Sequence, residues 1–169
     1  FNDGNSLPPT LISGFLLALG IGVLITWHAP HALSVIYPYV TLMTYNTAIG
    51  IITCGLGLYA TLRAHHVMVF ACCFILFAIS ALTILDIIVG IPLNTTNWFI
   101  VLLSEPPVHT QPMSPVSSAA FLLASLTLFF AMPTEGTRSI VATLLSLLIC
   151  FTAISTVISQ EFGLFPSFT

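Results

Sequence analysis

Residues 67–89 read VMVFACCFILFAISALTILDIIV, an apolar stretch in which Asp86 is the only charged side chain. An α-helix of about 20 such residues spans the roughly 30 Å of hydrocarbon in a bilayer. A helix is required there because lipid offers no hydrogen-bond partner to an unpaired backbone amide. The stretch therefore predicts a transmembrane helix.

The rest of the chain has the same character. Of its 169 residues, 57% are hydrophobic and 4% are charged, whereas about a quarter of the residues in a soluble domain are charged. The predicted fold is an all-α integral membrane protein, with residues 1–169 forming a single domain of five transmembrane helices in a bundle. The further spans are expected at residues 11–27, 43–62, 116–132 and 139–158, and an outer loop with a short interfacial segment at residues 93–112.

Two arginines predict the orientation of this bundle. Arg63 separates the second and third predicted helices and Arg138 separates the fourth and fifth, on the side where the N-terminus also lies. By the positive-inside rule this side is cytoplasmic. Five spans then put the C-terminus outside. Because the chain starts at Phe1 rather than at a methionine, we expect a piece of a longer protein.

The chain also resembles itself. Residues 43–48, MTYNTA, align with residues 113–118, MSPVSS, and both segments run into an apolar stretch. Thr44 and Ser114 are expected as N-caps because a hydroxyl can accept from the free amides of a first helical turn, where Pro115 is also tolerated. These matches predict a bundle built from duplicated helix pairs.

A second internal match concerns the acids. Residues 78–80 and Asp86 pair with residues 153–155 and Glu161, so that in both copies an acid follows a serine by six residues. The predicted repeat is an inward-running helix that opens with a polar cap, followed by an outward-running helix that closes with a carboxylate.

These residues resemble a known family. Trp27, the start Met43-x-x-Asn46-Thr47-Ala48 and the later Met113-Ser114-Pro115 are similar to the multi-pass N-terminal sensor regions of bacterial signalling proteins. Such regions precede PAS, histidine kinase or diguanylate cyclase modules. The resemblance covers residues 22–129, and it departs from the family at residues 116–118, where Val-Ser-Ser replaces Asn-Thr-Ala. It implies a location in the bacterial inner membrane and a role in signal transduction, as in two-component systems.

Polar groups gather at one predicted depth. An ionisable group inside a membrane is costly unless it is neutral, paired or wetted, which makes it a functional candidate. The predicted helix directions put six polar residues in the outer third of the membrane. They can form an outward-opening pocket for a ligand or a proton, or a set of interhelical hydrogen bonds worth about 0.6 to 2 kcal/mol each. The six are Asn46, Thr47, Asp86, Ser117, Ser118 and Glu161.

Trp98 belongs to residues 97–104, NWFIVLLS, a segment too short to span. It is expected either to lie flat in the membrane interface, anchored by Trp98, or to cap the bundle and close the predicted pocket over Asp86. Trp98 is therefore a candidate ligand-binding residue.

The histidines raise the question of haem b, which membrane bundles hold between two histidines. His28, His31 and His109 fall on the outer side, while His65 and His66 fall on the inner side, where they are expected to meet headgroups. No histidine lies at mid-span, so no cofactor is expected, and an outer haem held by His28 or His31 with His109 stays the alternative.

The remaining signals exclude several function classes. The cysteines lie inside predicted spans without a CxxC spacing and are interpreted as packing residues, so no metal site is expected. No catalytic motif is present, so no enzyme is predicted, and two cationic side chains exclude nucleic-acid binding. Small residues are expected to permit close approach of helices, within the chain or with a partner. They are Gly14, Gly20, Gly22, Gly50, Gly55 and Gly57.

The sequence therefore predicts a transmembrane sensing or anchoring region that relays an outer cue by helix repacking. Its expected partners are the lipid bilayer and either a second copy of the chain or other membrane subunits. Two alternatives stay open: a non-catalytic accessory subunit of a larger membrane complex, and an electron-carrying protein with haem b.

Overall fold

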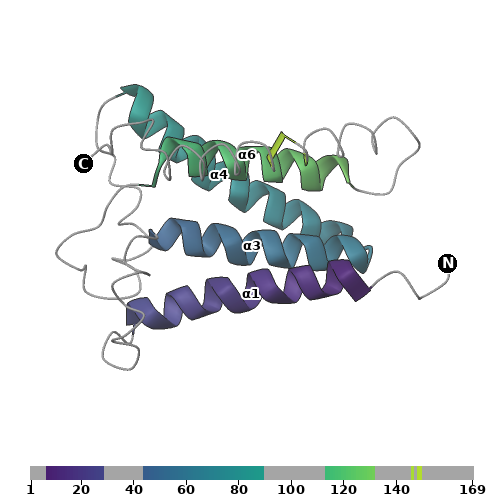
Figure 1. The fold of residues 1–169 in the computed structure, drawn as a ribbon. Helices are drawn as coiled ribbons and strands as arrows, with labels where there is room; N and C mark the ends of the chain where they lie inside the picture. Colours follow the sequence, from purple (N-terminus) through teal and green to yellow (C-terminus); the bar gives the residue numbers. More distant parts are fainter. Residues whose placement is uncertain (1–6, 29–43, 90–112, 132–145, 147, 150–169) are drawn as a thin grey trace.

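The computed structural model describes residues 7–28, 44–89, 113–131, 146, 148 and 149. This part of the chain is all-helical, with no strand. Its helices are α1 (Leu7–His28), α3 (Tyr45–Leu62), α4 (His66–Val89) and α6 (Pro115–Phe130) (Figure 1).

Three of the described helices are long and apolar enough to cross a membrane, namely α1, α3 and α4, and α6 is a shorter apolar helix. The all-α prediction is therefore confirmed for these residues, which indicate a membrane protein. The predicted spans at residues 43–62, 67–89 and 116–132 each match a helix to within two residues at either end, whereas α1 begins four residues before the predicted start. Most of the fifth predicted span, residues 139–158, lies outside the described residues.

Successive described helices run in opposite directions. The helix α1 packs on α3, α3 packs on α4, and α4 packs on α6, with a smaller contact between α3 and α6. Figure 1 shows that α3 and α6 begin at the end of the bundle where α1 and α4 finish. Among the described helices α3 is therefore the central one, since it contacts all three others.

The polar and apolar side chains are distributed in the opposite way to a water-soluble bundle. Large apolar side chains face outward, as Leu11 does with 70% of its surface exposed and Phe74 with 72%. Ser13 and Thr26 are buried instead, and each donates a hydrogen bond to a carbonyl of its own helix, Thr10 O and Gly22 O, at 2.9 Å. In hydrocarbon this arrangement satisfies the buried hydroxyls and gives the lipid an apolar surface.

A tight turn joins α3 to α4 at the other end of the bundle. Ala64 has a φ of 54°, which lets His65 N donate to Ala60 O at 2.9 Å and Ala64 N to Thr61 O at 3.1 Å. These two bonds form a Schellman motif, which ends a helix by satisfying its last carbonyls. The turn fixes Arg63 at this end, where its guanidinium lies 5.5 Å from the ring centre of Tyr59.

Glycines let α3 approach its neighbours closely. A Cβ atom built at Gly20 on α1 would meet the side chain of Ile52 and lie 3.1 Å from the backbone oxygen of Ala48. A Cβ at Gly55 on α3 would lie 3.1 Å from the backbone oxygen of Ser13. The two helices therefore pack almost backbone to backbone.

The prediction of close helix approach is confirmed inside the chain for four glycines: Gly20, Gly50, Gly55 and Gly57. A Cβ at Gly14 or Gly22 would have no neighbour within 4 Å among the described residues. For these two positions, close approach to a partner stays a prediction.

Gly20→Ala and Gly22→Ala form a matched pair that tests the contact between α1 and α3. Gly20→Ala is expected to lower the free energy of unfolding by about 1 to 3 kcal/mol, because its methyl group would overlap α3. Gly22→Ala is expected to leave it unchanged or raise it by up to about 1 kcal/mol, since alanine is the better helix former. Unfolding in mixed detergent micelles measures both values. Equal effects of the two substitutions would contradict the packing.

Candidate functional site

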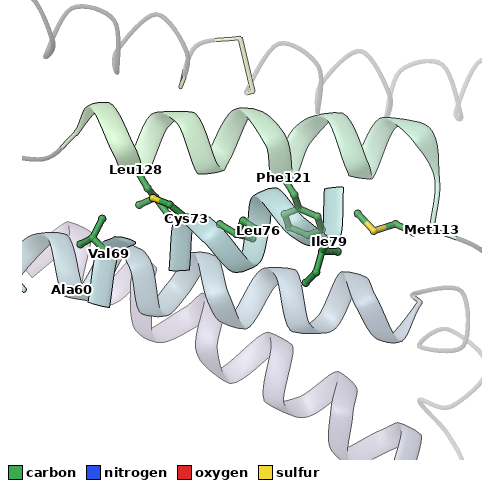
Figure 2. Packing of buried hydrophobic residues seen from close by; sticks show 8 residues of the cluster. All are labelled: Ala60, Val69, Cys73, Leu76, Ile79, Met113, Phe121 and Leu128. Atoms are coloured by element: carbon green, nitrogen blue, oxygen red, sulfur yellow. The ribbon is translucent and has the colours of Figure 1, made fainter. Parts of the chain in front are cut away.

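An apolar core lies between α3, α4 and α6 (Figure 2). The helix α4 contributes most of it, from one face with three-to-four-residue spacing, while α3 contributes Ala60 and α6 contributes Phe121 and Leu128. Met113, just before α6, closes the core at the end of the bundle where α3 and α6 begin. The cluster consists of Ala60, Val69, Cys73, Leu76, Ile79, Met113, Phe121 and Leu128.

Two contacts fix how α6 lies against α3. A Cβ at Gly50 would lie 2.5 Å from the ring of Phe121, and a Cβ at Gly57 would lie 2.6 Å from Leu128. Phe121 follows Gly50 by 71 residues, and Leu128 follows Gly57 by the same number. The two helices are therefore parallel and in a constant register, which differs by one residue from the 70-residue offset between the sequence repeats at 43–48 and 113–118.

The contacts between α4 and α6 give the opposite direction. Ser125 Oγ donates a buried hydrogen bond to Cys73 O at 2.9 Å, which joins α6 to α4. One turn away, the rings of Phe70 and Phe129 meet edge to face with their centres 5.8 Å apart. This antiparallel register places Asp86 level with Met113, just before α6 begins.

Helices α3 and α6 start with the same cap. The side chain of Thr44 accepts from Thr47 N at 3.3 Å, and that of Ser114 accepts from Ser117 N at 3.1 Å. In each cap the two hydroxyl oxygens lie 2.8 Å apart. The predicted N-caps are confirmed, and Pro115 stands in the first turn as expected.

Asn46 lies on the core-facing stripe of α3, one turn before Gly50. Only 3% of the residue is exposed. Its side-chain oxygen Oδ1 is buried and has no hydrogen-bond partner among the described residues. An unmade hydrogen bond at a buried amide costs about 1 to 3 kcal/mol. The buried side chain of Asn46 therefore lowers the stability of the fold instead of adding to it.

Asp86 continues the buried stripe of α4 one turn beyond Thr83. It is half-buried, and its oxygen Oδ1 is shielded from solvent. Asp86 is the only acidic residue in the described part of the chain, and Arg63 lies at the other end of the bundle.

Buried hydroxyls complete the same end. Ser118 has no exposed surface and donates to Ser114 O at 3.0 Å, while Thr83 is buried and donates to Ile79 O at 2.9 Å. Each hydroxyl has used its only proton within its own helix, so only its lone pairs stay available. We call Asn46, Thr83, Asp86 and Ser118 the polar end of the core.

The structure brings most of the predicted site residues to this end. Asn46, Asp86 and Ser118 lie on the buried stripes, whereas Thr47 and Ser117 serve as the second hydroxyls of the two caps. Glu161 and Trp98 lie outside the described residues. Thr83 is not among the site residues predicted from the sequence. It precedes Asp86 by three residues and so lies on the same helix face, a spacing from which it could have been predicted.

The histidines and cysteines add little to this site. His28 is exposed at the end of α1, with its ring centre 6.0 Å from that of Tyr45. His31 and His109, the other residues of the haem alternative, lie outside the described residues. Cys54, Cys72 and Cys73 are free thiols in the packed helices, and Cys150 lies outside the described residues. The described part of the chain contains no group of three His, Cys, Asp or Glu residues able to hold a metal ion.

Comparisons with protein-family models, with curated proteins and with solved structures find no match to this chain. The resemblance to bacterial sensor regions therefore stays a prediction from the residues.

Asn46→Leu tests whether the buried amide serves stability. Leucine has a similar volume, so removing the unmade hydrogen bond is expected to raise the free energy of unfolding by about 1 to 3 kcal/mol. Thr53→Val is the control, because Thr53 is buried on the same stripe and donates to Ile49 O at 2.8 Å. Unfolding in mixed micelles compares the two variants. A clear loss of stability in Asn46→Leu would show that the amide has a structural partner.

Proposed function

We propose that the chain is the membrane-sensing and anchoring region of a bacterial signalling protein in the inner membrane. In this proposal five transmembrane helices form duplicated pairs, and the N-terminus is cytoplasmic. A cue from the periplasm or the outer leaflet acts at the polar end, and the bundle relays it by a change in helix packing.

The orientation has support from the placement of Arg63. This residue and the start of α1 lie at one end of the bundle, and the polar end lies at the other (Figure 1). If the arginine end faces the cytoplasm, as the positive-inside rule predicts, the polar end faces outward and is accessible to an external cue.

The duplication is supported by the shared geometry of α3 and α6. Their caps have the same hydrogen bonds, and their parallel register agrees with the sequence repeat to within one residue. Corresponding residues of the two copies therefore lie at the same depth. Duplication of a helix pair would place two related polar helix N-termini side by side, as those of α3 and α6 are.

The buried amide of Asn46 is the observation that carries the proposal. A ligand changes a packing equilibrium only through its different affinity for the two packings. Asn46 belongs to α3, which contacts α1, α4 and α6. A ligand that completes the missing hydrogen bond of Asn46 therefore acts on the described helix that contacts all the others.

The accessory-subunit alternative requires the polar layer to be a permanent set of interhelical bonds. The hydroxyls of Ser118 and Thr83 instead bond to their own helices, which favours the sensor. A kinase or cyclase module encoded downstream in the same reading frame would support the sensor. A haem band in the visible spectrum of the purified chain would support the haem alternative.

Asp86→Asn in the full-length protein tests the proposed role of the polar end. The substitution keeps the shape of the side chain and removes its charge, so we expect normal membrane expression with an altered response of the cytoplasmic output. Thr53→Val, away from the polar end, is expected to leave the response unchanged. The test measures the amount of folded protein in membranes and the activity of the cytoplasmic output for each variant. Loss of the folded protein in Asp86→Asn would favour a structural role.

A further inference from the structure

We infer that an outward-facing groove between α4 and α6 binds an anionic phospholipid, with an acyl chain in the groove and the headgroup beside His66. The groove has a volume of about 340 Å³, within the range of small-molecule pockets, about 300 to 1,000 Å³. This site goes beyond the proposed function, and it does not depend on which side of the membrane the arginine end faces. Four phenylalanines line the groove, namely Phe70, Phe74, Phe77 and Phe129.

The chemistry of the groove suits hydrocarbon. Its buried floor contains Cys73 and Ser125, and Ser125 Oγ donates its only proton to Cys73 O at 2.9 Å. The floor therefore offers no hydroxyl donor to a ligand. The exposed rings of Phe70 and Phe129 meet edge to face one turn nearer the arginine end. A polar ligand would give up hydrogen bonds with water on such a surface, whereas an acyl chain has none to lose.

A second transmembrane helix fits this groove less well than an acyl chain does. Helices associate in lipid through small residues that let their backbones approach closely. The exposed residues that line the groove are bulky instead, as Phe74 is with 72% of its surface exposed in the described part of the chain. A straight helix would rest on these rings and leave the floor unfilled. The occupant that we infer is therefore a thin, flexible chain.

The groove has the length of one bilayer leaflet. His66, Phe70 and Phe74 follow one another at intervals of four residues and so lie on one face of α4, which Phe77 extends. From His66 to Phe77 the helix rises by about 16 Å, and one leaflet contains roughly 15 Å of hydrocarbon. An acyl chain that lies along the groove therefore brings its headgroup level with the first turn of α4.

The side chains at this end of the groove favour an anionic headgroup. His66 is exposed, and its ring has at least one N–H that a phosphate oxygen can accept from. Arg63 is exposed in the turn before α4 and is the only arginine or lysine among the described residues. The one acid among these residues, Asp86, follows His66 by 20 residues, about 30 Å along α4. Within the described part of the chain, no carboxylate therefore competes with a phosphate for these donors.

Quenching of a tryptophan in the groove by brominated lipids tests the inference. Phe74→Trp places the reporter in the groove and Phe15→Trp places it on α1, each in a chain that also carries Trp27→Phe and Trp98→Phe. The control is matched, because each position follows the first residue of its helix by eight residues from the arginine end, with 72% and 66% of the phenylalanine exposed. Nanodiscs of phosphatidylcholine contain an increasing fraction of brominated phosphatidylglycerol or, for reference, of brominated phosphatidylcholine.

At position 74 we expect the anionic lipid to bind about five-fold more tightly than the zwitterionic one. This ratio corresponds to about 1 kcal/mol, the attraction of one basic side chain near a membrane surface. At position 15 we expect a ratio of about one. His66→Ala and Arg63→Gln are each expected to lower the ratio at position 74, whereas His28→Ala, at the opposite end of the bundle, retains it. Unfolding in mixed micelles confirms that each variant is folded.

Absence of quenching at position 74 by either lipid would overturn the inference, because it shows that a protein segment fills the groove. Equal ratios at positions 74 and 15 would overturn it as well, since they indicate ordinary contact with the surrounding lipid. A ratio at position 74 that survives both His66→Ala and Arg63→Gln would contradict the headgroup site. Native mass spectrometry of the wild-type chain with an equimolar mixture of the two lipids measures the preference without a reporter, and equal binding there would also overturn the inference.

Discussion

The close contact of α3 with its neighbours is the constraint on which the rest of the described structure depends. Gly50 accommodates the ring of Phe121, and Gly57 accommodates Leu128, so a larger residue at either position would force the facing side chain of α6 to shift. Lipid supplies no hydrophobic force that would press helices together, and association depends on this kind of close packing. The same two contacts set the register that brings the caps of α3 and α6 to one depth.

The register explains how a polar end can exist beside an apolar core. Buried hydroxyls along the helices donate to backbone carbonyls, those of Thr26 and Thr83 within their own helices and that of Ser125 across to α4, so they add little cost in hydrocarbon. Asn46 is the exception, because it is fully packed and its oxygen lacks a donor among the described residues. An amide in this state is the kind of feature that a binding site retains and that a purely structural bundle would replace by an apolar side chain.

Much of the local structure could be predicted from the sequence. Composition and length predicted helices at residues 43–62, 67–89 and 116–132, and the hydroxyls of Thr44 and Ser114 predicted their caps, because these signals act over a few residues. The pairing of Gly50 with Phe121 could not be predicted, since it depends on which helices meet and in which register. For the same reason the sequence placed Asn46, Thr47, Ser117 and Ser118 in one layer but could not separate the core-facing residues from those that complete the caps.

A double-mutant cycle on Gly50→Ala and Phe121→Leu tests the central contact most directly. We expect Gly50→Ala to destabilise the wild-type chain and to cost much less when Phe121 is already shortened. The expected coupling energy is about 1 kcal/mol or more, measured by unfolding in mixed micelles. Gly50→Ala with Leu128→Ala is the control and is expected to be additive, because Leu128 contacts Gly57 instead. Additive effects for Gly50 and Phe121, or coupling of Gly50 to Leu128, would contradict the register.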